Sequence, residues 1–111
     1  MDSNDRSVLK TICDRINSVM FYCEGCRDLD DFESNKMRVE AVVFNFLQIG
    51  ELAKSKLSDE AKELMPDIPW HMIYGMRNRI VHGYEGVDLS IVWDTVKKDF
   101  PNLKEKLEKH F

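Results

Sequence analysis

The sequence has few residues that interrupt helices, and it lacks long apolar runs. Only 3 prolines and 5 glycines occur among 111 residues, whereas 43% of the residues are hydrophobic, which is typical of a globular chain able to form long helices. No run approaches the roughly 20 apolar residues that span a membrane, and the first five residues lack the basic and apolar parts of a signal peptide. We therefore expect a single domain over residues 1–111, located in the cytoplasm and not associated with a membrane.

The chain also lacks an excess of positive charge, because 16 Lys and Arg residues stand against 20 Asp and Glu residues and the formal net charge at pH 7 is −4. A protein that coats nucleic acid is usually basic, so any contact with RNA must be local. The window from His71 to Tyr84 contains Arg77 and Arg79 and no acidic residue. We predict a cationic region at these positions on an otherwise acidic protein.

The chain has 3 cysteines, two of which form the pair Cys23-x-x-Cys26. A redox motif of this form needs a strand followed by a helix, and a zinc site needs two further ligands at suitable spacing. Neither pattern is apparent, and Cys13 belongs to the same expected helix as Cys23. We predict ordinary reduced thiols, no metal site and no cofactor; a redox or zinc protein is the alternative.

Apolar residues recur at three- and four-residue spacing along most of the chain, which predicts helices. The expected helices are a first over about 5–23, a second over about 31–57, a short one from Ser58 to Pro66, a third from Pro69 to about His82, and a last region that begins near Asp88 or Ser90 and is kinked by Pro101. The predicted fold is all-α: an up-and-down four-helix bundle with a short connecting helix and a kinked C-terminal helix.

Four other features of the chain also lead to predictions. Gly50 interrupts the second helix at a cost of about 1 kcal/mol relative to alanine, which indicates close approach of another helix backbone. Glu51 beside it is either an exposed glutamate or a residue that supports a catalytic group. We expect Trp70 to anchor the core or an interface rather than stack on a nucleic-acid base. The acidic residues of 28–33 are expected to form a solvated loop and the first turn of the next helix; the alternative is a docking surface for a basic partner.

The stretch from Arg77 to Tyr84 is the most informative part of the chain. Ile73, Met76 and Ile80, which precede His82, form an apolar row that should face the core. A second row lies on one face of the same helix and is polar or lacks a side chain: His71, Gly75, Asn78 and His82. We expect this polar seam to lie at a surface, with a helix stop at Gly83.

Arg77 and His82 have the chemistry to cleave RNA without a metal. Histidine has an unperturbed pKa of about 6.5 and can act as an acid or base. Arginine binds phosphate bidentately and stabilises charge that develops on it. On an ideal helix, residues five positions apart point roughly 140° apart. We therefore expect the Arg77 and His82 side chains to approach each other only if the helix end is frayed or if a homodimer brings them together from two chains. The simpler alternative to a catalytic site is that the arginines are solvated charges and the histidine caps the helix.

The motif resembles that of a known family. Arg77-Asn78-x-x-x-His82 is similar to the R-x(4–6)-H signature of HEPN domains, and the extension to Tyr84 resembles the R-x4-H-x-Y form of the HepT toxins. Further stretches agree in order, namely Arg38–Ala41, Gln48–Ala53, Ile68–Trp70, Gly86–Leu89 and Val92–Asp94. The resemblance covers most of the chain, and the ordered set is far more specific than the motif alone.

This resemblance implies a metal-independent endoribonuclease toxin that cleaves RNA, either tRNA or mRNA, at a composite site of a homodimer. Arg77 and His82 would be catalytic, Asn78 and Glu51 supporting, and Arg77 and Arg79 RNA-binding. The implied partner is a minimal nucleotidyltransferase antitoxin, which would silence the toxin by AMPylation of Tyr84. The alternative is a non-catalytic helical subunit that serves as the substrate-binding partner of a nucleotidyltransferase.

Overall fold

The computed structural model describes residues 1–81 and 88–111, and in these ranges the chain forms helices and no strand. Nothing is described of the side chains of residues 79–81. The elements in chain order are α1 (Ser3–Tyr22), α2 (Leu29–Glu33), α3 (Lys36–Glu51), the π-helical turn η1 (Leu52–Lys56), α4 (Asp59–Leu64), α5 (Trp70–Val81), α6 (Leu89–Asp94), the π-helical turn η3 (Thr95–Asp99) and α7 (Phe100–Glu108).

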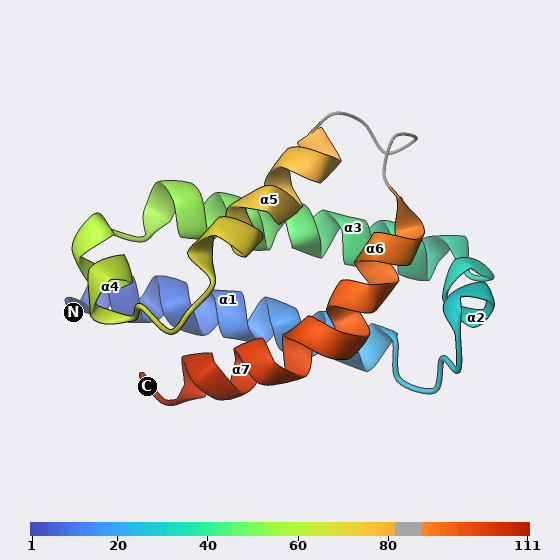
Figure 1. Ribbon diagram of the computed structural model, residues 1–111, viewed down its shortest axis with the longest axis horizontal. Coiled ribbons are helices and arrows are strands. Elements are labelled where there is room, and N and C mark those ends of the chain that lie inside the picture. The colour runs from blue at the N-terminus through green and yellow to red at the C-terminus, as the bar shows by residue number, and fades with distance from the viewer. Residues whose placement is uncertain (82–87) are drawn as a thin grey trace.

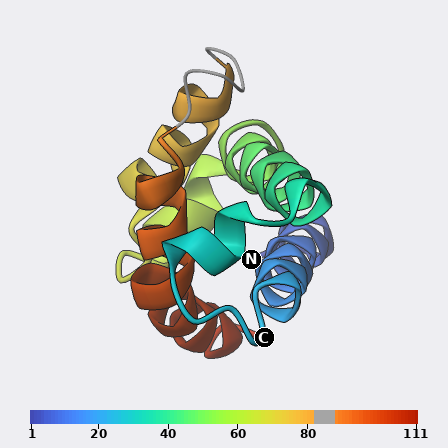
Figure 2. The same ribbon diagram turned by 90° about the vertical axis from the view of Figure 1, so that its right-hand side faces the viewer.

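Four long helical segments make up the bundle (Figures 1 and 2). α1 and α3 run side by side in opposite directions, α5 crosses over α3, and α6, η3 and α7 return along α1 as one bent segment. The end-on view places α1 and α3 on one side and α5, α6 and α7 on the other, with α2 at the near end. The predicted all-α architecture, with α4 as the short connecting helix, is confirmed.

The core lies between these two sides and is formed by the apolar stripes read from the sequence. The predicted stripe of α1, Leu9, Ile12, Ile16, Val19 and Cys23, is almost completely buried. Ile73 and Met76 of α5 are buried as well. Burial of each large aliphatic side chain stabilises the fold by about 1.5–3 kcal/mol, so these stripes hold α1 and α5 in place.

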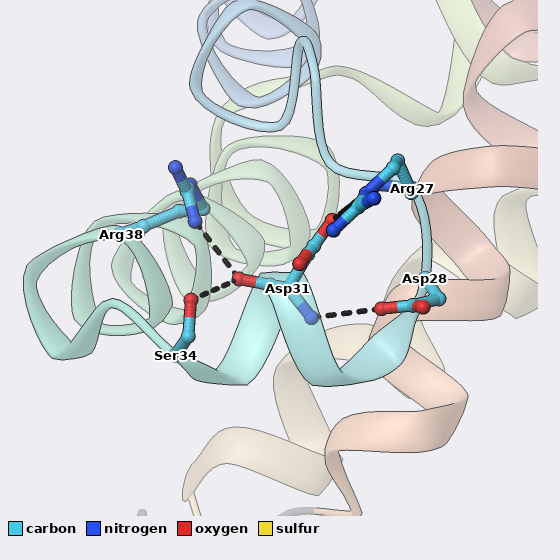
Figure 3. A network of polar contacts seen from close by, with 5 residues as sticks. All are labelled: Arg27, Asp28, Asp31, Ser34 and Arg38. Atoms are coloured by element: carbon cyan, nitrogen blue, oxygen red, sulfur yellow. Dashed lines mark hydrogen bonds and ion pairs between the residues drawn. The ribbon is translucent and has the colours of Figure 1, made fainter.

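The second predicted helix is interrupted, which corrects the sequence prediction of one helix over 31–57. α2 ends at Glu33, with Ser34 as its C-cap. Asn35 has an extended backbone, and its side chain accepts a hydrogen bond from Arg38 N at 3.1 Å, so Asn35 caps α3. Ser34 Oγ donates to Asp31 O at 2.7 Å, and Arg38 Nη1 donates to the same oxygen at 3.1 Å (Figure 3). These bonds fix the break, because they satisfy the Asp31 carbonyl group in the last turn of α2.

Half of the acidic stretch between α1 and α3 has a structural role (Figure 3). Asp28 caps α2 by accepting from Asp31 N at 2.9 Å. The Asp31 carboxylate accepts from Arg27 N at 3.0 Å and from Arg27 Nε at 2.9 Å, and these contacts hold its pKa below the ordinary range. Asp30 and Glu33 are exposed. The stretch therefore combines a capped short helix with a solvated surface.

The C-terminal segment bends where the sequence predicted a kink. Asp88 caps α6 by accepting from Ser90 N at 2.9 Å, and the π-helical turn η3 precedes Pro101. Proline cannot donate a backbone hydrogen bond and its ring crowds the preceding turn, which explains the change in direction. Phe100 and Leu103 beyond the bend remain buried.

Trp70 is half-buried, and its Nε1 donates to Met65 O at 3.2 Å, so it anchors the loop that leads into α5, as predicted. Within the described residues, no helix is both long and apolar enough to cross a membrane.

Candidate functional site

The site is built where α5 crosses α3, at Gly50. A Cβ atom added to Gly50 would lie 2.5 Å from Arg77 Cβ, 3.0 Å from Arg77 N and 3.1 Å from Arg77 Cα. Any residue with a side chain would therefore push α5 away at the position of Arg77. The sequence prediction that Gly50 marks a close helix approach is confirmed, and the residue that it approaches is Arg77.

Arg77 is held by an ion pair as well as by this close contact. Its Nε donates to Glu51 Oε2, while Glu51 Oε1 accepts from Ser55 Oγ at 2.9 Å. Both contacts lower the pKa of the Glu51 carboxyl, and the hydrogen bond from Arg77 is the larger cause. Glu51 is therefore a carboxylate at neutral pH, oriented from one side by Ser55 and engaged on the other with the arginine.

The ion pair leaves part of the guanidinium available for a ligand. An arginine has five N–H donors, and the four on its Nη atoms can still donate to two oxygens of a phosphate. The Arg77 side chain is 27% exposed, and that of Glu51 is 42% exposed. Arg77 thus reaches the surface from a fixed, half-buried base, which favours binding of an anion in one defined orientation.

The chain leaves α-helical geometry directly after Glu51. The π-helical turn η1 spans Leu52–Lys56 and carries Ser55, and Lys54 in the same turn also contributes to lowering the Glu51 pKa. Such single π-helical turns within helices are frequent at functional sites. This turn places a hydroxyl and a cation beside the carboxylate that holds Arg77.

The polar seam of α5 lies at the surface, as predicted. His71 and Asn78 are exposed, and a Cβ at Gly75 would meet no atom within 4 Å. Met76, on the opposite side of the helix, is buried. The described part of the seam is therefore an open strip that runs along α5 past Arg77.

Three predicted site residues do not enter this geometry. His82 and Tyr84 lie outside the described residues, together with the predicted helix stop at Gly83, and for Arg79 only the helical backbone is described. The structure brings together Arg77 and Glu51, with Asn78 one position along α5. Convergence of Arg77 with His82 remains a prediction.

The charge of this region differs from what the sequence window indicated. No acidic residue occurs between His71 and Tyr84, but α3 brings Glu51 against Arg77 from 26 positions away. The positive charge of Arg77 is therefore partly compensated in space. Ser55, which holds Glu51, was not singled out in the sequence; its position four residues after Glu51 on the same helical face was the available signal.

The three cysteines are buried thiols of low reactivity. Cys13, Cys23 and Cys26 are free thiols and all are buried. Desolvation raises the pKa of Cys13, and desolvation together with the neighbouring Cys26 raises that of Cys23 to about 11. Thiols in this state are poor nucleophiles and poor metal ligands. Among the described residues, no group of three or more His, Cys, Asp or Glu side chains could hold a metal ion.

Comparison with known proteins assigns the chain to a family. The family model described as "Ribonuclease HepT-like" matches residues 9–110. The chain belongs to this family of HepT-like ribonucleases. The R-x4-H-x-Y pattern noted in the sequence at positions 77–84 begins with the arginine that Glu51 of α3 holds.

Several relatives of this HepT-like chain cover nearly its full length or most of it. A protein of Thermococcus cleftensis named "Probable ribonuclease HepT" is 36% identical over 98% of this chain and 97% of its own. A Methanocaldococcus jannaschii protein named as a candidate RNase is 33% identical over 93% and 95% of the two chains. Another candidate RNase, from Caldanaerobacter subterraneus, is 34% identical over 71% and 70%. No solved structure matched the chain significantly.

Proposed function

We propose that this protein is an endoribonuclease toxin that cleaves RNA without a metal ion. The observation that carries the proposal is the fixed position of Arg77, which Gly50 and Glu51 hold five residues before His82 in a chain of the HepT-like family. Relatives named as ribonucleases support RNA as the substrate. Within RNA, tRNA and mRNA are the two expected targets.

The reaction follows from the chemistry of the two groups. A base removes the proton of the RNA 2′-hydroxyl, and the 2′-oxygen attacks the adjacent phosphorus. The P–O5′ bond breaks, and an acid protonates the leaving 5′-oxygen. The products are a 2′,3′-cyclic phosphate and a 5′-hydroxyl. His82 serves as acid or base, while Arg77 donates to the phosphate oxygens as negative charge develops on them. Asn78 and Arg79 assist by binding the neighbouring backbone.

The complete site is proposed to form in a homodimer. On an ideal helix, residues five positions apart point in different directions, so a two-fold axis that joins two copies could supply each motif with groups from the other. The open seam of α5, with Gly75 at its centre, supports a cleft into which RNA can enter. The dimer then offers two arginines and two histidines around one cleft.

Regulation is proposed to occur at Tyr84 through a minimal nucleotidyltransferase antitoxin. The phenol oxygen attacks the α-phosphorus of ATP, the bond to the pyrophosphate breaks, and AMP remains on the tyrosine. This bulky anion lies two residues from His82, where it competes with RNA for the arginine. The R-x4-H-x-Y pattern at 77–84 supports this proposal.

A test compares the wild-type chain with His82→Ala and Arg77→Lys on a defined RNA, with EDTA present. We expect cleavage by the wild type only, with 2′,3′-cyclic phosphate ends. Arg77→Lys keeps the charge but loses bidentate geometry, so it separates charge from positioning. Cleavage that persists in both variants, or that depends on added magnesium, rules out the mechanism. Binding of RNA without cleavage by the wild type would instead support the non-catalytic alternative.

The antitoxin proposal needs a separate experiment. Co-expression with a neighbouring nucleotidyltransferase should add AMP to Tyr84 and stop cleavage, whereas Tyr84→Phe should remain toxic beside the same partner. Intact-mass spectra without AMP addition, combined with neutralised toxicity, would show that inhibition occurs by binding alone.

A further inference from the structure

Lys62 of α4 is a largely covered lysine with only a weak ion pair in the described part of the chain. Its side chain is 13% exposed, whereas that of Lys98, in a surface ion pair, is 75% exposed. Lys62 Nζ is 3.9 Å from Asp59 Oδ1, which is beyond hydrogen-bond distance, and the Asp59 side chain is 97% exposed. Such a pair contributes little. Among the described residues, the three N–H donors of Lys62 therefore have no hydrogen-bond partner.

The ammonium of Lys62 lies against a tyrosine of α5. Its Nζ is 5.1 Å from the centroid of the Tyr74 ring, which is a cation–π distance. Tyr74 is half-buried and packs against the core, and its hydroxyl makes no hydrogen bond to any residue that the structure describes. The stem of a covered lysine is usually buried while its charged end reaches toward water. The contact therefore places two groups with unused donors side by side where α4 meets α5.

This contact lies beside the candidate site. Tyr74 precedes Arg77 by three residues, so the two are neighbours on the surface of α5, with a rise of about 4.5 Å between them. The turn η1, which follows Glu51 and leads to α4, also contacts α5. The Lys62–Tyr74 contact and the Glu51–Arg77 pair therefore occupy adjoining positions along one side of α5.

We infer that Lys62 and Tyr74 bind the RNA phosphate next to the one that is cleaved. The inference rests on the proposed function, in which Arg77 binds the scissile phosphate. An RNA strand held at Arg77 has a further phosphate one nucleotide away. The oxygens of that phosphate accept from Lys62 Nζ and from the Tyr74 hydroxyl, and so provide the hydrogen bonds that these donors lack. Lysine supplies a point charge there, whereas the arginine fixes orientation.

The acidic residues around Lys62 limit how strongly it attracts RNA. Asp59 extends into solvent, and Glu60 and Glu63 of the same helix are exposed. Glu51 is already engaged with the arginine of the site. These carboxylates offset the field of one ammonium at a distance but do not contact it within 3.5 Å. Lys62 should therefore make one short-range phosphate contact and not provide general attraction for nucleic acid.

Three short oligonucleotides separate the two phosphate positions. Each contains one ribonucleotide among deoxynucleotides, so cleavage by the 2′-hydroxyl is confined to one linkage. A dinucleotide has the scissile phosphate alone. One trinucleotide adds a phosphate on the 5′ side, and the other adds it on the 3′ side. If Lys62 and Tyr74 bind a neighbouring phosphate, the wild type should cleave one of the two trinucleotides about tenfold better than the dinucleotide, measured as kcat/KM.

The variants test which side chains produce this advantage. Lys62→Met should abolish it, with the loss in KM, because the contact is made to a phosphate that does not react. Tyr74→Phe keeps the ring beneath Lys62 and loses only the hydroxyl, so the advantage should fall about threefold. Lys98→Met is the matched control, because it removes the same charge from an exposed lysine of η3 and should keep the advantage. Melting followed by circular dichroism checks that each variant is folded.

The outcomes separate this inference from the proposed function. A wild type that cleaves RNA but prefers neither trinucleotide, or a Lys62→Met variant that keeps the preference, overturns the inference and leaves the ribonuclease proposal intact. Equal losses on all three substrates, with a lower melting temperature, show that Lys62 only holds α4 against α5 and also overturn it. If the wild type binds a longer RNA without cleaving it, the proposed activity fails. Lys62→Met should then still lower the slope of log Kd against log salt by about 0.7, and an unchanged slope overturns the phosphate contact as well.

Discussion

Gly50→Ala is the change that most directly tests how the fold positions Arg77. The added Cβ would lie 2.5 Å from Arg77 Cβ, whereas carbon atoms in favourable contact lie about 3.5–4.0 Å apart. The near atoms also include Arg77 N and Cα, which belong to the backbone of α5. Rotation of a side chain cannot relieve this contact, so α5 must shift by about 1 Å relative to α3.

The stability change should be small because two effects oppose each other. Overpacking costs about 1–3 kcal/mol, and replacing glycine by alanine in a helix regains about 1 kcal/mol. The net loss is therefore about 0–2 kcal/mol, and the protein should remain folded. The effect on activity should be larger, because a misplacement of about 1 Å at a catalytic group can reduce the rate on the order of 100-fold.

The assay combines urea unfolding with single-turnover cleavage of a defined RNA. Gly75→Ala serves as the stability control, because its Cβ would meet no atom within 4 Å and the change should add up to about 1 kcal/mol. Cleavage by Gly50→Ala within about threefold of the wild type, in a folded protein, would refute the idea that the α3–α5 distance sets the position of Arg77.

Three further predictions concern individual side chains. Glu51→Gln keeps a hydrogen-bond acceptor for Arg77 but loses the charge, so the single-turnover cleavage rate should fall about tenfold. Glu51→Ala also loses the acceptor, so its rate should fall about 100-fold. Equal rates for both variants would contradict the role of Glu51 in positioning Arg77. Asp5 accepts from Ser58 N at 3.0 Å and Ser58 Oγ at 2.7 Å, which lowers its pKa. The Asp5 carboxyl therefore binds a proton more readily in the unfolded chain than in the folded protein. Its contribution to folding stability is present above about pH 4 and is lost as the pH falls further. Asp5→Asn should therefore flatten the decline of the urea unfolding midpoint between pH 5 and 3. Burial raises the pKa of Cys23 to about 11, so this thiol should react with a disulfide reagent at pH 7.5 only on unfolding; fast reaction of the native protein would show otherwise.

Much of the fold could be predicted because each long helix has a strongly periodic apolar stripe. The stripe of α1 and the capping residues Ser58 and Asp88 lie where the sequence placed them. The break between α2 and α3 was missed because Ser34 and Asn35 sit inside a continuous helical pattern. Their hydrogen bonds end one helix and begin another, which periodicity alone does not detect.

Only part of the candidate site could be predicted from the sequence. The spacing within one helix predicted Arg77 and the open seam. Gly50 predicted a close approach of another helix but not the residue that it approaches. The link between Glu51 and Arg77 spans 26 positions, so it depends on how α5 crosses α3 and not on any local pattern. Ser55 was missed for the same reason, since its role exists only through Glu51.

The Glu51–Arg77 pair also bears on how an acidic protein can bind RNA. With a net charge of −4, the chain as a whole repels a phosphate backbone, and the carboxylate of Glu51 offsets part of the positive charge of Arg77. The pair therefore positions the guanidinium but adds little attraction of its own. Attraction must then come from other cations, and one that we propose is Arg79, two residues after Arg77. In the proposed homodimer the arginines of both copies would face the same RNA, so we expect the monomer to bind and cleave RNA poorly.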